Sequence, residues 1–323
     1  MRMMDRRTLV QALTKMASLV PVIATSTKAP AVQPAAGRSI QRKIDEVSSL
    51  ADRLDIKDFD DVAFAARLAF ANANTASGRG VSFRVPPRVM VLKEPLLVPD
   101  RIVLVGSGIR DTIFQAMHDG PMFIFSDVEH AGLLHARLGL GERPGTKGIQ
   151  IEARKRDVRR LSFVEIEIAG GGAPGKGQIG VSATTSGKNI LTECSFDRVM
   201  LSEVDRPVIE RGPEGNEWTR FVVDQFGYHG GAAFDSISHA NHYQGRIAGS
   251  PGGGAIGFRQ AGRHNMMLLR VDIGNEARAL ELAPDGRNIV LLQRPSEAGP
   301  PVVQTPVGQV TGNTVIDGDD ALR

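Results

Sequence analysis

The feature that most constrains this chain is a succession of short apolar or alternating segments that runs from Val81 to Gln293. Val81–Val85, Ile102–Gly106 and Phe163–Ile168 are rich in β-branched or alternating residues, and each is bounded by turn-forming residues. Such a pattern predicts β-strands. The chain also has 36 glycines but one tryptophan and two tyrosines, a composition that favours a turn-rich β architecture over a helical bundle.

From the middle of the chain onward, similar segments recur at intervals of about 20 to 30 residues. Four of them align on an apolar residue that we expect to point inward: Phe196, Phe226, Ile247 and Val271. An asparagine precedes the strand of each repeat: Asn189, Asn241, Asn265 and Asn288. Asparagine suits a left-handed turn and can hydrogen-bond its counterpart on the next coil. These repeats predict an all-β, right-handed parallel β-helix, a solenoid in which each coil adds one strand to each sheet.

The segment before the first strand predicts a cover for the exposed end of such a solenoid. Asp61–Asn72 has helical apolar spacing and an aspartate that can cap its N-terminus. A second, shorter helix is expected within Ser39–Leu54. The predicted organisation has four parts: a signal peptide and linker at 1–34, a helical cap at 35–80, the β-helix at 81–296 and a C-terminal tail at 297–323.

The first residues have the layout of an export signal. Met1–Arg7 carries three arginines, and the largely apolar Thr8–Ala24 follows. The pair Arg6-Arg7 with the residues after it resembles a twin-arginine signal, which implies a secreted or periplasmic protein. The alternative is a short amphipathic helix of a cytoplasmic protein. No other stretch approaches the roughly 20 apolar residues of a membrane span.

Three segments near the start of the predicted solenoid carry a family resemblance. Ile56–Ala63, then Gly80–Pro87, then Leu104–Gly108 resemble the opening of pectate-lyase-superfamily β-helix proteins, which include pectate lyases, polygalacturonases and tailspikes. Arg88 stands where that family's pattern has a glycine. The resemblance implies a β-helix with an N-terminal cap and an acidic or complex polysaccharide as substrate. The matching segments contain no catalytic residues.

One window of the sequence contains every tryptophan and tyrosine together with several titratable side chains. Aromatic faces stack on sugar rings, and carboxylates and histidines transfer protons. The interpretation as a carbohydrate site assigns catalysis to Asp224, His229 and Arg246. It assigns substrate binding to Trp218, Tyr228, His242, Tyr243, Arg270 and Asp272. The alternative is that these are ordinary surface and turn residues.

Arg246 and Arg270 are expected to face outward on neighbouring coils. Two like charges so close require an anion between them, either Asp272 or a substrate carboxylate. The first possibility is a salt-bridge ladder with Asp272 and Asp197, and the second is a site for a uronic-acid polymer. The resemblance implies that an arginine can act as the base in a lyase. The alignment puts Asp224 in one column with Cys194, Gly245 and Leu269, which leaves both an outward and an inward orientation open for it.

Cofactor and partner expectations are limited. A single cysteine, expected to pack inward, excludes a disulfide framework and a cysteine-built metal site. No cofactor or metal is expected, although the resemblance allows calcium at Asp197, Asp224 or Asp272. The net charge of +3 does not indicate nucleic acid as a partner. The function expected is an exported glycoside hydrolase or polysaccharide lyase acting on acidic polymers. The alternative is a non-catalytic carbohydrate-binding or surface and assembly β-helix.

Overall fold

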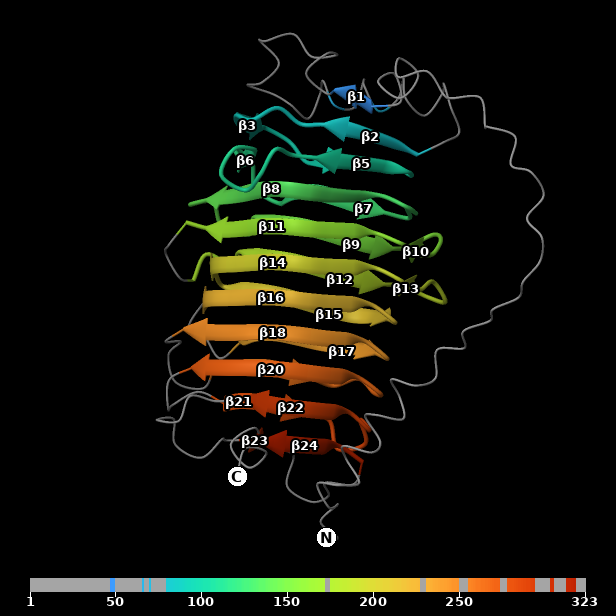
Figure 1. Ribbon diagram of the computed structural model, residues 1–323, viewed down its shortest axis with the longest axis vertical. Helices are drawn as coiled ribbons and strands as arrows, with labels where there is room; N and C mark the ends of the chain where they lie inside the picture. The colour runs from blue at the N-terminus through green and yellow to red at the C-terminus, as the bar shows by residue number, and fades with distance from the viewer. Residues whose placement is uncertain are drawn as a thin grey trace, which may run out of the picture. The chain divides into compact units, whose positions relative to one another are not determined.

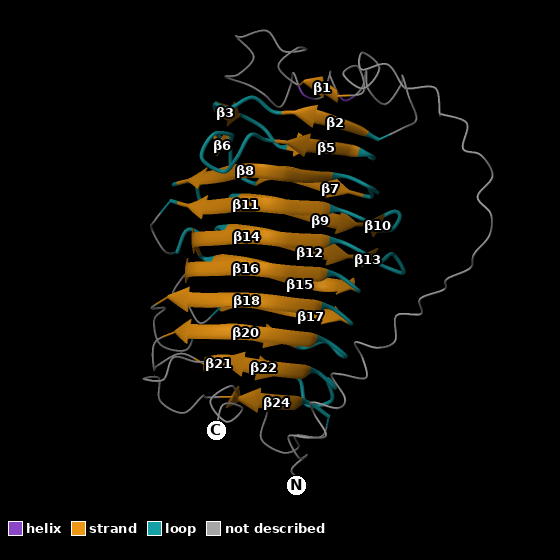
Figure 2. Ribbon diagram, viewed as in Figure 1, coloured by secondary structure: helices purple, strands orange, loops and turns teal. Residues whose placement is uncertain are grey.

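The computed structural model describes residues 47–49, 66, 70, 80–171, 175–226, 231–249, 255–273, 278–293, 303–304 and 312–317. The chain divides into two units, 1–42 and 43–323, and every described residue belongs to the second. The described part is almost entirely strands and the loops that join them (Figure 2). Among its residues, no helix is long and apolar enough to cross a membrane.

The strands pair in parallel and form two large sheets and one small sheet. Sheet A contains β1 (Val47–Ser49), β2 (Val81–Arg84), β3 (Val89–Leu92), β5 (Ile102–Val105), β6 (Ile113–Ala116), β8 (Gly132–Gly141), β11 (Ser162–Gly170), β14 (Ser195–Val204), β16 (Glu217–Phe226), β18 (His242–Gly249), β20 (Met266–Ile273), β22 (Ile289–Gln293) and β24 (Thr314–Asp317). Sheet B contains β4 (Leu96–Leu97), β7 (Pro121–Ser126), β9 (Lys147–Ala153), β12 (Ile179–Thr185), β15 (Arg206–Glu214), β17 (Ala232–His239), β19 (Ile256–Gln260), β21 (Arg278–Leu282) and β23 (Val303–Gln304). The small sheet pairs β10 (Val158–Arg159) with β13 (Leu191–Thr192).

From β7 onward the chain alternates between the two large sheets, so each coil places one strand in sheet A and one in sheet B, whereas the first coils place two consecutive strands, β2 and β3 and then β5 and β6, in sheet A. In Figure 1 the strands of sheet A lie in front and run to the left, those of sheet B lie behind and run to the right, and the chain descends. This is a right-handed coil, the hand that parallel strand connections almost always take. The expected all-β parallel solenoid is confirmed.

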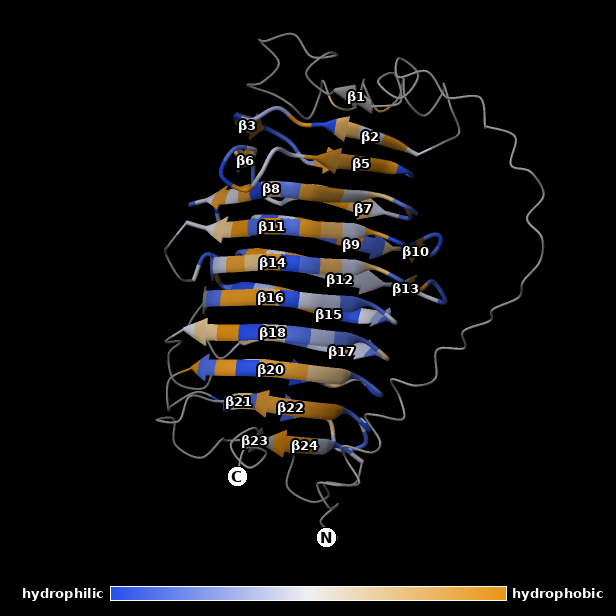
Figure 3. Ribbon diagram, in the orientation of Figure 1, coloured by the Kyte–Doolittle hydropathy of each residue, from blue (hydrophilic) through white to orange (hydrophobic). Residues whose placement is uncertain are grey.

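Residues in the left-handed backbone conformation bend the coils at equivalent positions of successive strands. One column crosses the middle of the sheet A strands, with φ near +55° at His135, Glu165, Arg198 and Arg220. Such backbone is unusual for residues other than glycine and turns the chain sharply. The four side chains are polar, and hydrophilic segments mark the middle of β8, β11, β14 and β16 in Figure 3. The bend therefore places a polar column on the outer face of sheet A.

The interior of the coils is filled by stacked apolar side chains. Phe163, Phe196 and Trp218 occupy paired positions of β11, β14 and β16. The rings of Phe163 and Phe196 lie 5.0 Å apart, and those of Phe196 and Trp218 lie 3.9 Å apart and almost parallel at 3°. Stacking of equivalent rings on successive coils follows from the parallel register, because equivalent residues lie about 4.8 Å apart.

The asparagine ladder is confirmed at three of the four expected positions. The Asn241 amide N–H donates to Asn265 Oδ1, and the Asn265 amide N–H donates to Asn288 Oδ1, both at 2.9 Å. The prediction that Asn189 belongs to this ladder is wrong, because its Nδ2 donates instead to the Arg154 carbonyl. The ladder also contains two asparagines that the repeat alignment missed, Asn216 and Asn313. The left-handed residue is the one before the asparagine, such as Ala240 or His264.

The repeat alignment is partly wrong in register. Ile247 and Val271 do pair, and both are buried. Their partner on β16 is Val223, not Phe226, and Phe196 pairs with Trp218. The error arises because the alignment matched Phe196 with Phe226 as similar apolar residues, whereas the two occupy different columns of sheet A.

The N-terminal cap is described at a few residues. Ala66 and Phe70 are helical and buried, and the Phe70 ring packs edge-on against Phe83 of β2 at 5.4 Å. The rest of the helix expected over Asp61–Asn72 lies outside the described residues, as do the expected export signal and linker. The prediction of a shorter helix within Ser39–Leu54 is wrong for residues 47–49, because these residues form the strand β1, which pairs with β2.

Candidate functional site

A groove of about 310 Å³ crosses the outer face of sheet A. Side chains and backbone from four neighbouring strands, β16, β18, β20 and β22, form its walls. Its lining consists of Arg220, Phe221, Val222, Gln244, Gly245, Arg246, Leu268, Leu269, Arg270 and Gln293. Three of these ten residues are arginines and none is a carboxylate or an imidazole, so we call this feature the arginine groove.

Local backbone geometry produces the groove. The pairing of β16 with β18 shifts register between Trp218 and Phe221, where Arg220 takes its left-handed conformation. Gly245 pairs with Phe221, and a Cβ at Gly245 would lie 2.4 Å from the Phe221 carbonyl oxygen and 2.5 Å from its ring. A side chain at this position is therefore excluded. The close approach makes Phe221 and Gly245 the floor of the groove.

Arg246 and Arg270 pair directly across β18 and β20, as expected. Their side chains are 51% and 55% exposed. Both donate through Nε to Oδ2 of Asp272, at 2.9 Å and 3.1 Å. The Asp272 side chain is mostly buried, and its Oδ1 has no hydrogen-bond partner within the described chain. One recessed carboxylate thus holds two guanidinium groups at the surface.

The third arginine of the groove is held in the same way. Asp197 on β14 accepts hydrogen bonds from Arg220 Nε at 3.0 Å and from Nη2 at 2.9 Å. Thr219 donates a further hydrogen bond to Asp197. The salt-bridge arrangement with Asp272 and Asp197, one of the two alternatives from the sequence, is present. Because the arginines remain exposed, the arrangement leaves donors available to a ligand.

The sequence-based role of Trp218 and Tyr243 is wrong. Both side chains are 0% exposed and belong to the interior stack, so neither can lie against a sugar ring. Rare aromatic residues cluster in this window because consecutive coils present equivalent inward positions, and Trp218 pairs with both Phe196 and Tyr243. The clustering reflects core packing.

The polar atoms of these two side chains converge on a residue that the sequence interpretation missed, Glu210 on β15. Glu210 is buried, and it accepts hydrogen bonds from Trp218 Nε1 at 2.9 Å, from Tyr243 Oη at 2.7 Å and from Ser236 Oγ at 2.9 Å. Burial raises the pKa of the Glu210 carboxyl, and these hydrogen bonds oppose the rise. The signal lay in the strand alternation, since Glu210 shares a face with Val208.

The other residues predicted for the carbohydrate site do not lie together in the groove. Asp224 is exposed and pairs with Ser202 and Ala248, so the column assigned to it from the sequence is wrong. Asp224 and Arg246 do lie outward on neighbouring strands. His242 begins β18 and does not line the groove. Tyr228 and His229 lie outside the described residues.

Other chemical features of the described residues are few. Cys194 is buried as expected, and burial raises the pKa of its thiol to about 12. No group of three or more histidine, cysteine, aspartate or glutamate side chains in the described chain is placed to hold a metal ion.

Comparison with known proteins gives structural neighbours at low identity. No protein-family model matches the sequence, and no curated protein matches it. The chain is similar to ORF18 of Geobacillus virus E2, at 12% identity and a TM-score of 0.44, with 86% of this chain and 62% of that one covered, so it spans less than two thirds of the viral protein.

Two further solved structures are enzymes by their titles. The A-module of the mannuronan C-5 epimerase AlgE6 of Azotobacter vinelandii is 11% identical with a TM-score of 0.40, and 83% of this chain and 99% of that one are covered. An endo-xylogalacturonan hydrolase from Aspergillus tubingensis is 10% identical with a TM-score of 0.44, and 84% and 91% are covered.

Proposed function

We propose that this protein binds an acidic polysaccharide in the arginine groove. The observation that carries the proposal is the placement of Arg220, Arg246 and Arg270 on three neighbouring strands, all exposed and all lining one groove. A guanidinium group offers a fork of N–H donors that matches a carboxylate. Neighbouring strands are about 4.8 Å apart, so the groove offers a row of such donors to a polymer with repeated carboxylates.

The charge balance at Asp272 supports an anionic ligand. Arg246 and Arg270 share this one carboxylate, so two guanidinium groups face a single carboxylate next to Arg220. Because Trp218 and Tyr243 are buried, the sugar-stacking surface expected from them is not available. Recognition at this groove then depends on charge and on the apolar edge formed by Val222 and Leu268.

A second candidate function is hydrolysis of the bound polymer, favoured by the positions of Asp224 and Asp272. Asp224 pairs with Ala248, which pairs with Asp272, so the two aspartates occupy one column two strands apart. Their Cα atoms are then about 10 Å apart. Inverting glycosidases place their two carboxyl groups roughly 6.5–9.5 Å apart, with a water between them. Ala248 leaves the intervening position small.

Both functions imply that the protein meets its polymer outside the cytoplasm, which is the location that the N-terminal sequence favours. We therefore place the protein among secreted or periplasmic proteins as part of this proposal. Detection of the mature chain in periplasmic or culture fractions, shortened by the length of a signal peptide, would support this location. A full-length chain confined to the cytoplasm would contradict it.

Binding is tested with the purified full chain and polygalacturonate, with a neutral polymer for comparison. Arg246→Gln should weaken binding to polygalacturonate about tenfold or more, because a charge-assisted hydrogen bond is lost. Arg263→Gln removes the same charge from an exposed turn outside the groove, and binding should stay at the wild-type level. Equal affinity in wild type and Arg246→Gln would overturn the proposal.

Hydrolysis is tested separately by the release of reducing ends from the same polymer. Asp224→Asn should abolish release and leave binding intact, since the substitution keeps the three arginines to which binding is assigned. The ultraviolet absorbance of an unsaturated product would indicate elimination in place of hydrolysis. If wild type releases no product while binding persists, the protein is a non-catalytic polysaccharide-binding β-helix.

A further inference from the structure

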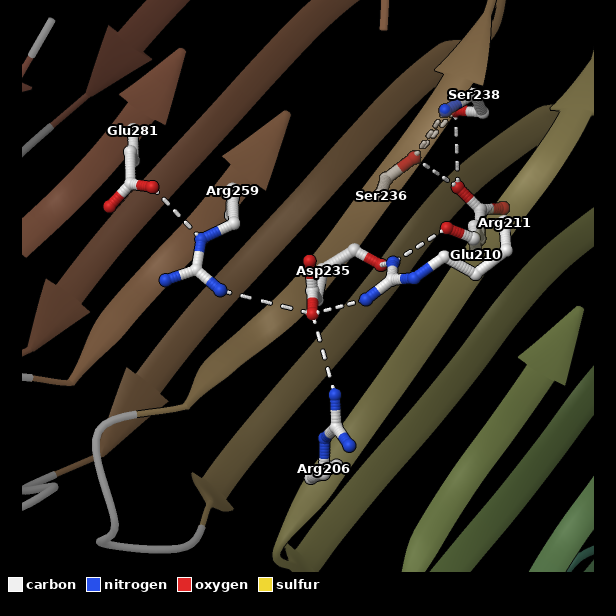
Figure 4. A network of polar contacts seen from close by, with 8 residues as sticks. All are labelled: Arg206, Glu210, Arg211, Asp235, Ser236, Ser238, Arg259 and Glu281. Carbon is white, nitrogen blue, oxygen red and sulfur yellow. Dashed lines mark hydrogen bonds and ion pairs between the residues drawn. The ribbon is translucent and has the colours of Figure 1, made fainter. Parts of the chain in front are cut away.

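A second group of arginines lies on the outer face of sheet B (Figure 4). It consists of Arg206 and Arg211 on β15, Arg259 on β19 and Arg278 on β21, arranged around Asp235 and Glu281. We call these six residues the Asp235 cluster. The strands that carry them are consecutive in sheet B, so the cluster extends over three strand spacings, about 14 Å.

Asp235 lies at the centre of the cluster. Its Oδ2 is 2.6 Å from Arg211 Nη2, 3.4 Å from Arg206 Nη2 and 3.9 Å from Arg259 Nη1. The three guanidinium groups cover the carboxylate and leave the residue 7% exposed. Asp235 therefore acts as a recessed anchor, and the surface above it is made of arginine.

The backbone and Glu281 fix the orientation of the guanidinium groups. Arg211 Nη1 donates to the carbonyl oxygens of Glu210 and Asp235 at 2.8 Å and 2.9 Å. Glu281 accepts hydrogen bonds from Arg259 Nε and Arg278 Nη1, both at 3.0 Å. Held in this way, the side chains lose little further conformational freedom when a ligand binds, which favours affinity.

The cluster carries an excess of positive charge. Three guanidinium groups, those of Arg206, Arg211 and Arg259, contact the single carboxylate of Asp235, so positive charge is in excess at this point. Arg206 is 45% exposed, and its guanidinium group contacts Asp235 through Nη2 at 3.4 Å, so further N–H donors remain available to a ligand. Like charges held this close repel one another unless an anion lies between them. The complementary ligand carries carboxylate or sulfate groups.

This cluster and the arginine groove lie on different sheets. The groove is on sheet A and the cluster on sheet B, which lie in front and behind in Figure 1, with the buried side chains of the coil between them. Packed sheets are about 10 Å apart, and the side chains of each outer face add to that separation. A short oligosaccharide in the groove cannot reach the cluster.

We propose that the Asp235 cluster is a second, independent binding site for an acidic polysaccharide, and that the protein joins two polymer chains when both sites are filled. The choice of polymer rests on the function proposed for the groove. The existence of the second anion site rests only on the geometry of sheet B.

The test is calorimetric titration of the full chain with a short carboxylated oligosaccharide, repeated with a sulfated one of equal length. Wild type should bind two equivalents of at least one of them. Arg206→Gln/Arg259→Gln should lose one equivalent, with affinity at that site lowered about tenfold or more. Asp235 keeps Arg211 and Glu281 keeps Arg278 in this variant, so its melting temperature should stay close to that of wild type.

Single variants separate charge from fold. Arg206→Gln should weaken the second equivalent, and Arg206→Lys should restore part of the affinity, because lysine keeps the charge but lacks the fork. Arg263→Gln serves again as the matched control and should bind two equivalents. If Arg206→Gln and Arg206→Gln/Arg259→Gln both bind exactly as many equivalents as wild type, with unchanged affinity, the second site does not exist.

The two proposals fail in different ways. If Arg246→Gln has no effect and Arg206→Gln/Arg259→Gln abolishes all binding, the groove function is wrong and the site on sheet B stands. If Arg246→Gln abolishes all binding, the second site is wrong and the groove function stands. With long polygalacturonate, wild type should form turbid networks, and each variant that binds one equivalent should not.

Discussion

The early and late coils of this solenoid share parallel pairing in sheet A but fill their interiors differently. At the turn before each sheet A strand, the early coils carry the buried residues Ala131, Leu161 and Cys194. The late coils carry asparagine at the equivalent place: Asn216, Asn241, Asn265, Asn288 and Asn313. The change occurs between β14 and β16, where the Cys194 amide N–H donates to Asn216 Oδ1. The turn before a sheet A strand thus accepts either a buried apolar side chain or an asparagine.

The same change occurs inside sheet B. Ile151 pairs with Ala183, which pairs with Glu210, and Ser236 and Gln260 continue the column. An apolar column therefore becomes polar at β15. Stability of the early interior depends on filled volume. The polar part of the late interior depends in addition on its hydrogen bonds, because an unpaired buried group is costly. Gln260 Nε2 is such a group, since it has no hydrogen-bond partner in the described chain.

The largest expected effect is at Glu210. Glu210→Ala removes the acceptor of Trp218 Nε1, Tyr243 Oη and Ser236 Oγ and leaves a cavity, so the free energy of unfolding should fall by about 3–5 kcal/mol. Chemical denaturation measures the loss. Glu210→Gln keeps an acceptor and should lose less. A loss below about 1 kcal/mol in Glu210→Ala would show that the late interior does not depend on this network.

A smaller loss is expected in the ladder. Asn265→Ala removes the acceptor of the Asn241 amide and should lower the free energy of unfolding by about 1–2 kcal/mol. Asn189→Ala, outside the ladder, is the matched control and should be close to neutral. Equal unfolding midpoints for wild type and Asn265→Ala would mean that the hydrogen bonds of the asparagine turns do not contribute to the free energy of unfolding.

Titration of Glu210 distinguishes the two interiors by pH. Because burial raises its pKa in the folded state, the folded protein binds more protons than the unfolded chain between the ordinary and the raised pKa. The stabilisation is fully present below the ordinary carboxyl pKa and is lost as pH rises through the raised one, by at most about 1.4 kcal/mol per pH unit. The stability of Glu210→Gln should lack this decline. Parallel pH curves for the two proteins would contradict the assignment.

The smallest perturbation concerns Cys194, at the boundary between the two interiors. Its raised pKa, about 12, and its burial keep the thiol protonated and covered at neutral pH. A thiol-specific reagent should therefore label the chain slowly when folded and rapidly when unfolded by denaturant. Because the chain has one cysteine, the readout reports this position alone. Rapid labelling of the folded protein would show that Cys194 is accessible to solvent and would contradict its burial.

Much of the architecture could be predicted from local sequence. Short β-branched runs between turn residues gave the strands β2, β5 and β11 close to their observed bounds, and Asn241, Asn265 and Asn288 occupy equivalent turns. The outward register of Arg246 and Arg270 also followed from alternation. These features depend on residues near one another in sequence or on strict repeats, which is why they could be read locally.

The functional residues were harder to predict, because burial depends on partners from other coils. Trp218 has the side chain of a sugar-binding residue, and only its stacking on Phe196 shows that it belongs to the core. Glu210 has the side chain of a surface residue, and only the convergence of Trp218, Tyr243 and Ser236 makes its burial possible.

By itself, the sequence determined that the chain forms repeated short strands, that its turns favour asparagine in the later repeats, and that Arg246 and Arg270 lie outward. The tertiary structure alone decided which residue of one coil meets which residue of the next. Coil lengths vary and the β16–β18 pairing shifts register near Arg220, so the pairing is set by the packing of whole coils. Alternation along a strand identifies residues that share a face, and the neighbouring coils decide whether that face is core or surface.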